Sequence, residues 1–332
     1  MNRQITLAAL PVGFPRGSDF ALVETEIPTP GAGEVLVRSQ WLSLDPYMRG
    51  RMSQVRSYAK PTVVGEAMPG QVVGEVVGSE DSRFAPGDVV VGQLGWQDYA
   101  VARGGTLRKV DPALAPPRTA LHVLGMTGLT AYFGLFDVGK PTPGDAVVVS
   151  AASGAVGQIV GQLAKLSGCG PVVGLAGSPE KVADLTELYG YDVGIDYKLG
   201  DVNAALKAAC PKGVDVYFDN VGGAVSETIF RRLAIGARVP VCGQISQYNL
   251  AEPELAPRNL GFLIVLRARL EGFLVSDYAH RFDEGLHRLG GWLAEGKLRY
   301  REDVTEGLEN APAAFIGMLN GANRGKALVK IR

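Results

Sequence analysis

A strand, a turn of small residues and a helix follow one another at residues 145–165, DAVVVSAASGAVGQIVGQLAK. Such a turn binds a pyrophosphate, because glycines let the backbone approach it and the N–H groups at the start of the helix donate to its oxygens. Aligned with the pattern GxGxxG, the turn has Ala152, Gly154 and Gly157, so only the first glycine is replaced. Taken alone, the turn is also compatible with simple close packing of a helix on a strand.

The second strand, PVVGLAGS at 171–178, ends where an NAD-binding sheet carries an acidic residue for the ribose hydroxyls, about 20 residues after the glycine turn. This chain has Ala176, Gly177 and Ser178 there, so no carboxylate repels a 2′-phosphate. Ser178 is placed to cap the next helix, and Lys181 falls in its first turn, where ammonium and helix dipole both attract phosphate. A lone Lys181 would be interpreted as a surface lysine, but beside the missing acid it predicts NADPH as the cofactor.

Two further strands end in residues that can hold a nicotinamide or a substrate carbonyl. FDNVGG places Asn220 at the carboxyl end of a strand, which faces the ligand in a parallel sheet, although Asn and Gly are also ordinary turn residues. VCGQISQYN brings Ser246 and Tyr248 just beyond the next strand. The phenol of Tyr248 can donate to a carbonyl oxygen and to the enolate that develops from it, as a conjugate reduction requires. A packing role is the alternative interpretation of this tyrosine.

A parallel sheet brings such strand ends together, and the chain from Asp145 onward has the pattern of one. Near-continuous apolar strands alternate with helices, which is typical of a doubly wound fold with helices on both faces. Six strands match the dinucleotide-binding architecture. They are AVVVSAA (146–152), PVVGLAG (171–177), VGIDY (193–197), VDVYFDN (214–220), ARVPVCG (237–243) and RLEGFLV (269–275).

The first 120 residues have a different character, with short β-rich runs separated by Pro, Gly and Asp, as in a compact barrel or sandwich. After Val275 the pattern predicts an amphipathic helix, a second helix and a final strand that return to this first part. The predicted domains are therefore 1–123 completed by 276–332, and 124–275. The early runs are ITLAAL (5–10), FALVETEI (20–27), EVLVRSQWLSL (34–44), QVVGEVVGS (71–79), DVVVGQL (88–94) and QDYAVA (97–102).

Composition and charge are those of a protein that acts on small molecules. The 332 residues are 46% hydrophobic and 20% charged, and the net charge is −1, so no field recruits nucleic acid or an anionic membrane. No stretch reaches the roughly 18 apolar residues of a membrane span. The three cysteines and three histidines lack the spacing of a disulfide framework or a metal site, so we expect no metal and a cytoplasmic protein.

Together, these motifs resemble the medium-chain dehydrogenase/reductase superfamily, and within it the zinc-independent branch of prostaglandin reductases and alkenal or curcumin double-bond reductases. The resemblance covers nearly the whole chain. Its carriers are LSLDPYMRG (42–50), FAPGDVV (84–90), GMTGLTAY (125–132), AASGAVGQIVGQ (151–162), GSPEK (177–181), YFDNVGG (217–223), CGQISQYN (242–249) and NRGKALVK (323–330).

The resemblance implies an α/β protein in which a GroES-like β-barrel catalytic domain is joined to a Rossmann domain with a doubly wound parallel sheet. It further implies NADPH as cofactor and a homodimer joined through the cofactor domains. Tyr248 and Tyr47 would be the catalytic and substrate-side residues, with loops 51–70 and 249–262 as the pocket wall. The cofactor would contact Gly154, Ala155, Val156, Gly157 and Gln158 at the pyrophosphate, Ser178, Lys181 and Tyr197 at the adenosine phosphate, and Asn220, Cys242, Gly243, Gln244, Ile245, Ser246, Tyr248, Phe273, Leu274, Val275 and Asn323 elsewhere.

Zinc-dependent relatives have a cysteine and a Gly-His-Glu element where this chain reads SLDPYMRG and VGEAMPGQ, so the resemblance implies a zinc-free enzyme. The expected activity is NADPH-dependent reduction of the C=C bond of a small hydrophobic enone or enal. A quinone oxidoreductase is the nearest alternative, since it shares the fold. A non-catalytic NADPH-binding protein is a further alternative, because a fold does not determine a function.

Overall fold

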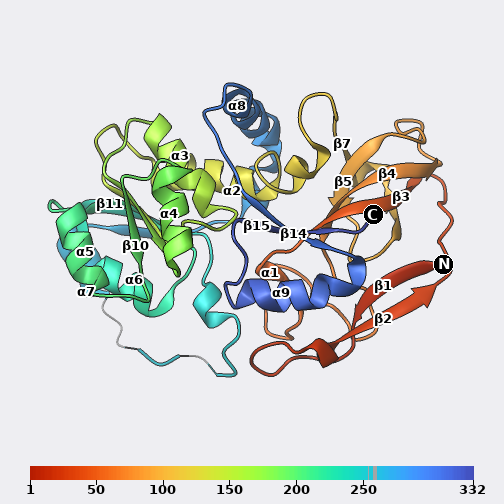
Figure 1. Ribbon diagram of the computed structural model, residues 1–332, viewed down its shortest axis with the longest axis horizontal. Helices are drawn as coiled ribbons and strands as arrows, with labels where there is room; N and C mark the ends of the chain where they lie inside the picture. Colours follow the sequence, from red (N-terminus) through yellow and green to blue (C-terminus); the bar gives the residue numbers. More distant parts are fainter. Residues whose placement is uncertain (253, 257–259) are drawn as a thin grey trace. The chain divides into compact units, whose positions relative to one another are not determined.

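The computed structural model describes residues 1–252, 254–256 and 260–332, which are drawn in Figure 1. It divides into two compact units: the first is Met1–His122 with Glu302–Arg332, and the second is Val123–Arg301. Within the described parts of the chain, every helix falls short of the length and apolar character of a membrane-spanning helix.

The second unit contains a six-stranded parallel sheet in the order β10-β9-β8-β11-β12-β13. This is the strand order of the dinucleotide-binding fold. Starting from β8, the next two strands of the chain are added on one side, β9 and then β10, and the last three on the other side, β11 to β13. The predicted doubly wound sheet is therefore confirmed, with the strands at β8 (Val147–Val149), β9 (Val172–Ala176), β10 (Val193–Asp196), β11 (Val214–Phe218), β12 (Leu233–Val241) and β13 (Arg269–Gly272).

Helices cover both faces of this sheet because its strands are apolar on both sides. Val147 and Val149 of β8 lie in one core with α2, α3 and α8, whereas Val148 between them lies in a second core with α5, α6 and α7. Alternate residues of a strand point to opposite faces, which explains the division. The helices of this unit are α2 (Met126–Phe133), α3 (Gly157–Leu166), α4 (Pro179–Glu187), α5 (Val202–Ala209), α6 (Gly223–Phe230), α7 (Gly261–Leu266) and α8 (Phe282–Ala294).

The first unit is built on a seven-stranded sheet with β14-β15-β3-β4-β5-β7 in order and β6 paired to β3. A separate hairpin, β1 and β2, joins it through a bridge between Gln4 and Gln97. The strands are β1 (Asn2–Leu7), β2 (Phe20–Thr25), β3 (Glu34–Ser43), β4 (Gln71–Ser79), β5 (Val89–Gln93), β6 (Tyr99–Arg103), β7 (Arg108–Lys109), β14 (Glu302–Glu306) and β15 (Lys326–Lys330), and the helices are α1 (Tyr47–Arg51) and α9 (Ala311–Leu319).

Aromatic packing joins the two ends of the chain within this first unit. Trp96 is fully buried between Phe20, whose ring is stacked at 5.9 Å, and Phe315 of α9, whose ring meets it edge-on at 5.6 Å. Such aromatic pairs add attraction beyond the area that they bury. The amino-terminal hairpin and the carboxyl-terminal helix therefore share one hydrophobic core.

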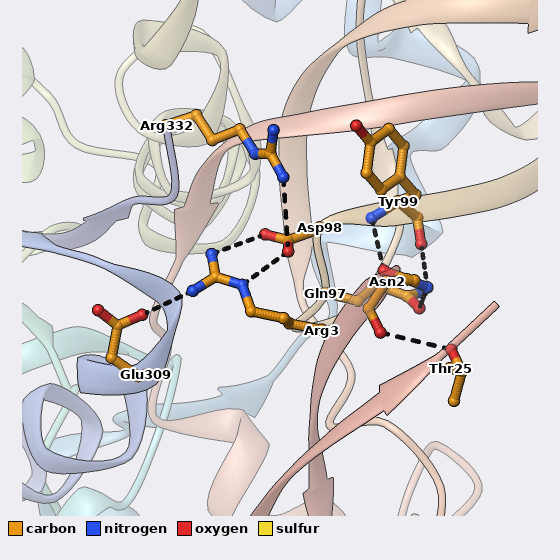
Figure 2. A network of polar contacts seen from close by, with 8 residues as sticks. All are labelled: Asn2, Arg3, Thr25, Gln97, Asp98, Tyr99, Glu309 and Arg332. Carbon is orange, nitrogen blue, oxygen red and sulfur yellow. Dashed lines mark hydrogen bonds and ion pairs between the residues drawn. The ribbon is translucent and has the colours of Figure 1, made fainter. Parts of the chain in front are cut away.

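A polar network around Asp98 makes a second connection between the termini (Figure 2). The buried Asp98 accepts two hydrogen bonds from Arg3, at 2.8 and 3.1 Å, and lies 3.7 Å from a guanidinium nitrogen of Arg332. Arg3 also reaches Glu309, and beside it Asn2 exchanges hydrogen bonds with the backbone of Tyr99. A bidentate guanidinium satisfies both oxygens of a buried carboxylate, so this network fixes β1 against the rest of the unit.

The extent of the two units differs from the predicted domains at the second boundary. The chain returns to the first unit at Glu302 and not at residue 276. The amphipathic helix α8 belongs to the second unit, because its Leu289 is buried in the core of that unit and its Glu284 accepts a hydrogen bond from Tyr132 of α2. The sequence showed an apolar face on this helix but not which core would bury it.

Candidate functional site

The loops that follow the strands of the parallel sheet carry most of the predicted residues, and we call their end of the sheet the carboxyl edge. The turn after β8 is held by a hydrogen bond from Gly154 N to Ala151 O, at 2.9 Å. A Cβ atom at Gly157 would lie 2.4 Å from Ala151 O and 2.6 Å from the Cα atom of Ala152. Because only glycine fits there, α3 begins directly against the turn, in the arrangement that a pyrophosphate needs.

The alanine that replaces the first glycine of the pattern is accommodated by the neighbouring strand. Ala152 is fully buried, and a Cβ atom at Gly174 of β9 would lie only 2.8 Å from the Cβ atom of Ala152. The methyl group at position 152 therefore occupies space that a glycine on β9 leaves open. This fit shows that the turn keeps its close packing despite the substitution.

The adenosine end of the predicted site is assembled after β9 and β10. Ser178 caps α4 by accepting a hydrogen bond from Lys181 N at 3.4 Å, and Pro179 occupies the first helical turn. The Tyr197 hydroxyl lies over Gly177, since a Cβ atom there would be 2.8 Å from it. Lys198 lies 5.9 Å from the centre of the Tyr197 ring. Two lysines and two hydroxyl groups thus belong to one short stretch of the carboxyl edge.

Asp219, which directly follows β11, organises the next part of the carboxyl edge. Its buried carboxylate accepts hydrogen bonds from the hydroxyl groups of Ser150, Tyr217 and Ser226, at 2.7 to 3.2 Å, and from the N–H groups of Val221 and Gly222. Five donors compensate for the burial of one negative charge. The neighbouring Asn220 donates from its side-chain amide to Ser150 O at 2.8 Å, so its position is fixed between the first and fourth strands.

The loop after β12 interlocks with this turn. The carbonyl oxygen of Asp219 accepts from the N–H groups of Cys242 and Gly243, and Ser246 donates from its hydroxyl to Val221 O at 2.7 Å. Tyr248 turns back over this loop, and its hydroxyl oxygen accepts from Gln244 N at 3.2 Å. The structure therefore brings Asn220 and the loop of Tyr248 together.

Cys242 does not supply a nucleophile at this position. Although the residue as a whole is half-buried, burial of its thiol, reinforced by the charge of Asp219, raises the pKa to about 12. A thiol with such a pKa is protonated at neutral pH and unreactive. Cys242 therefore contributes to the predicted cofactor site only through its backbone groups and the space that its side chain fills.

Several predicted cofactor residues use their side chains for packing. The Gln158 side chain exchanges hydrogen bonds with the backbone of Arg301, at 2.8 and 3.4 Å, and its backbone N–H donates to Gly154 O at 3.0 Å. Phe273 follows β13, and its ring meets Phe218 edge-on at 6.2 Å. Val275 packs against the same core, and Leu274 lies between them at the start of a 3-10 helix. Ala155 and Val156 directly precede α3, and Ile245 begins the short 3-10 helix that follows β12.

Tyr47 and Asn323 belong to the first unit. Tyr47 begins α1, and its hydroxyl is buried without a hydrogen bond of good geometry among the described residues. The side chain of Gln93 is close enough to lower its pKa, but this is a lesser effect than burial. Burial, with the charge of Asp45 as the second cause, raises the pKa of Tyr47, so the phenol stays protonated as a donor. Asn323 donates to Gly325 O at 2.6 Å, which shapes the loop before β15.

An ion pair inside the first unit fixes the chain immediately before Tyr47. Lys326 of β15 donates to Asp45 at 2.8 Å and to Leu44 O at 2.6 Å, and Ser43 donates to the other carboxylate oxygen of Asp45. The side chains of Lys326 and Asp45 are 1% and 4% exposed, so water screens the pair little.

Sequence reasoning missed three groups: Asp219, Lys198 and the pair of Asp45 with Lys326. An acidic residue inside an apolar strand end was the available signal for Asp219, since a buried carboxylate needs many donors. No local signal pairs residues 45 and 326, which are distant in sequence. In the predicted wall loop 249–262, residues 253 and 257–259 lie outside the described part of the chain.

Comparisons with known proteins agree with this geometry. Residues 3–110 match a family model described as the N-terminal domain of oxidoreductases, and residues 155–290 match one described as a zinc-binding dehydrogenase. The chain is 49% identical to the putative NADP-dependent oxidoreductase YfmJ of Bacillus subtilis, over 99% of this chain and 98% of that one. It is 46% identical to the NADPH-dependent curcumin reductase of Escherichia coli, over 99% and 97%.

Among solved structures, CurA from Vibrio vulnificus in complex with NADPH superposes with a TM-score of 0.95 at 46% identity, over 99% of both chains. The fold and the sequence define an oxidoreductase with a GroES-like domain and a Rossmann domain, which confirms the expected fold class. The chain belongs to the medium-chain dehydrogenase/reductase family, in its zinc-independent branch of prostaglandin, curcumin and alkenal reductases. Among the described residues, no three His, Cys, Asp or Glu side chains are grouped to hold a metal ion.

Proposed function

We propose that this protein uses NADPH to reduce the C=C bond of α,β-unsaturated ketones and aldehydes. The observation that carries the proposal is the carboxyl edge of the second unit, where a glycine turn, an acid-free strand end with Lys181, and the interlocked loops of Asn220 and Tyr248 follow successive strands. Relatives named for curcumin and alkenal reduction support the substrate class.

The residues present fit NADPH. The start of α3 at Gly157 would hold the pyrophosphate, and Ser178, Lys181 and Tyr197 would hold the 2′-phosphate that no carboxylate repels. Asn220 and the backbone of residues 242–246 would hold the nicotinamide end. Bound in this way, the cofactor supplies a hydride to the β-carbon of the enone.

The contribution of the protein is to orient the substrate and to stabilise the negative charge on its oxygen. Tyr248 accepts a hydrogen bond from Gln244 N, which orients the phenol, and its O–H donates to the substrate carbonyl as the enolate forms. We propose Tyr47 as a second substrate contact in the first unit. Solvent then protonates the α-carbon, because an enolate is basic enough to take a proton from water.

Rates of NADPH oxidation test this function. Benzalacetone should be reduced, whereas its saturated counterpart benzylacetone should not, since only the enone has a β-carbon that accepts hydride. Menadione serves as the quinone comparison. Faster turnover of menadione than of any enone or enal would favour a quinone oxidoreductase, and binding of NADPH without turnover of any acceptor would favour a non-catalytic role.

Replacement of Lys181 tests the cofactor preference. Lys181→Ala should weaken NADPH binding by roughly 10- to 100-fold, the value of a charge-assisted hydrogen bond, and leave NADH binding nearly unchanged. Lys212→Ala is the matched control, because this exposed lysine precedes β11 at the opposite end of the sheet. Fluorescence titration of both nucleotides measures the effect, and equal losses for NADPH and NADH would refute a contact with the 2′-phosphate.

We also propose a homodimer formed through the second unit. Its edge strand β13 pairs on one side with β12, and the nearby α7 exposes Ile264 and Val265 at 81% and 70%. An exposed apolar group beside a sheet edge is typical of a surface that another chain covers. Sedimentation equilibrium should give twice the monomer mass of 35.1 kDa. We place this dimer in the cytoplasm, where its three thiols stay reduced.

A further inference from the structure

One serine at the end of β8 holds both the backbone and the side chain of Asn220. Ser150 is fully buried, and it directly follows β8. Its hydroxyl oxygen accepts a hydrogen bond from Asn220 N at 2.9 Å, and its carbonyl oxygen accepts one from Asn220 Nδ2 at 2.8 Å. The direction of strand addition changes between β8 and β11, and ligands of such sheets bind outside the strand ends at this point. Asn220 is therefore fixed at the place in the second unit where a cofactor is expected.

The contact with Ser150 decides which way the amide of Asn220 faces. A carbonyl oxygen can only accept, so it is the amide nitrogen of Asn220 that lies against Ser150 O. The amide oxygen is on the other arm of the planar group, and the residue is half-buried. Asn220 thus presents an acceptor, and the groups that match it are the ribose hydroxyls and the carboxamide N–H of a nicotinamide riboside.

The hydroxyl of Ser150 is in turn oriented by Asp219. It donates to Asp219 Oδ1 at 3.2 Å, closer than its second acceptor, Phe218 O, at 3.5 Å. A hydroxyl has one proton to donate, and a carboxylate is the stronger acceptor. Because its proton is directed toward Asp219, the oxygen of Ser150 keeps its lone pairs for Asn220 N.

Ser226 of α6 offers a comparison for Ser150. Both serines are buried, and each donates its hydroxyl to a different oxygen of Asp219. The Oγ atom of Ser226 lies 2.7 Å from Oδ2 of Asp219, and its other partner is the Tyr217 hydroxyl at 2.8 Å. Of these two serines, Ser150 is the one that bonds to Asn220. Removing each hydroxyl separately therefore distinguishes support of Asp219 from support of Asn220.

We propose that Ser150, oriented by Asp219, is a positioning residue that holds the amide oxygen of Asn220 toward the nicotinamide riboside half of NADPH. The proposal rests on the proposed function, which places that half of the cofactor at Asn220 and the loop after β12. Ser150 is buried and contacts neither cofactor nor substrate itself. Its contribution is to fix one acceptor in advance, so that binding does not have to order the side chain of Asn220.

Two nucleotides separate the positioning of Asn220 from general support of the fold. NADPH carries the nicotinamide riboside, whereas 2′,5′-ADP has only the adenosine end with its 2′-phosphate. Ser150→Ala should weaken NADPH binding by roughly 3- to 10-fold, the value of one neutral hydrogen bond, and leave 2′,5′-ADP binding within about twofold. Ser226→Ala is the matched control, because it also leaves Asp219 with one donor fewer, and it should keep both dissociation constants within about twofold. Calorimetric titration measures both nucleotides.

A double-mutant cycle tests whether Ser150 acts through Asn220. Asn220→Ala removes the amide, so it should weaken NADPH binding at least as much as Ser150→Ala does. In the Asn220→Ala background, Ser150→Ala should change the dissociation constant by less than about twofold, because no amide is left to position. A serine that only stabilised the fold would give the same loss in both backgrounds.

Four results would overturn the assignment: an equal loss of NADPH and 2′,5′-ADP binding in Ser150→Ala, the same loss of NADPH binding in Ser226→Ala, additive losses in the double variant, or unaltered NADPH binding in Asn220→Ala. The proposed function is decided apart from these titrations, by the turnover of benzalacetone. A protein that shows the expected losses of NADPH binding but reduces no enone would support the role of Ser150 and contradict the proposed activity.

Discussion

We expect Tyr248→Phe to lower kcat for benzalacetone by roughly 10²- to 10³-fold, the usual effect of removing one preorganised donor to a developing oxyanion. The phenylalanine keeps the ring and removes only the hydroxyl. In the structure this hydroxyl accepts from Gln244 N at 3.2 Å and lies over Gly243, where a Cβ atom would be 3.1 Å from it. The substitution therefore removes the donor without opening a cavity, and stopped-flow measurement of NADPH oxidation reports the loss.

Measuring the dissociation constant of NADPH distinguishes the loss of a catalytic donor from a disturbed conformation of the loop at residues 242–248. Tyr248→Phe should leave it within about threefold, because residues 242–246 keep their own hydrogen bonds to Asp219 and Val221. Tyr197→Phe is the matched control, since it removes a hydroxyl from the adenosine end and should raise the dissociation constant without lowering kcat. If Tyr248→Phe turned over benzalacetone at the wild-type rate, this tyrosine would have no catalytic role.

The periodicity of the sequence was sufficient to predict the sheet of the second unit. Runs such as PVVGLAG and VDVYFDN are apolar on both faces, which only a sheet covered by two helical layers can bury, and the observed order of strands follows. The limits of the units were less predictable. Helix α8 has an apolar face that suits either core, and its assignment depends on contacts with Leu129 and Phe133 of α2 that no local pattern encodes.

In the candidate site, too, roles set by the local sequence could be predicted, whereas roles set by distant contacts could not. Positions whose role depends on backbone conformation, such as Gly157 and Ser178, could be predicted because the turn and the cap require those residue types. Side chains whose role depends on distant partners could not. Gln158 lies within the glycine turn, yet its side chain is engaged by the backbone of Arg301. Of the five donors to Asp219, the hydroxyl of Ser150 reaches it only when β8 and β11 become neighbours.

The ion pair of Lys326 with Asp45 carries the second large prediction. We expect Lys326→Met to destabilise the protein by about 3–5 kcal/mol, because it leaves a buried carboxylate without its cation. Burial lowers the pKa of Lys326, whereas the charge of Asp45 and its hydrogen bond act in the opposite direction. The effect of the substitution should be large because it removes this compensation from a buried carboxylate. Calorimetric unfolding should show it as a lower melting temperature, with loss of the ordered turn that begins α1 at Tyr47.

Two comparisons isolate the charge from the loss of packing. Lys330→Met changes an exposed lysine of the same strand, whose partner Glu306 is 78% exposed, and should cost at most about 1 kcal/mol. The double variant Lys326→Met with Asp45→Asn removes both charges, so it should recover much of the stability that the single variant loses. A Lys326→Met protein as stable as the wild type would mean that the pair of Lys326 with Asp45 adds no net stability to the fold. The turn before Tyr47 would then depend on its hydrogen bonds alone and not on the ion pair with β15.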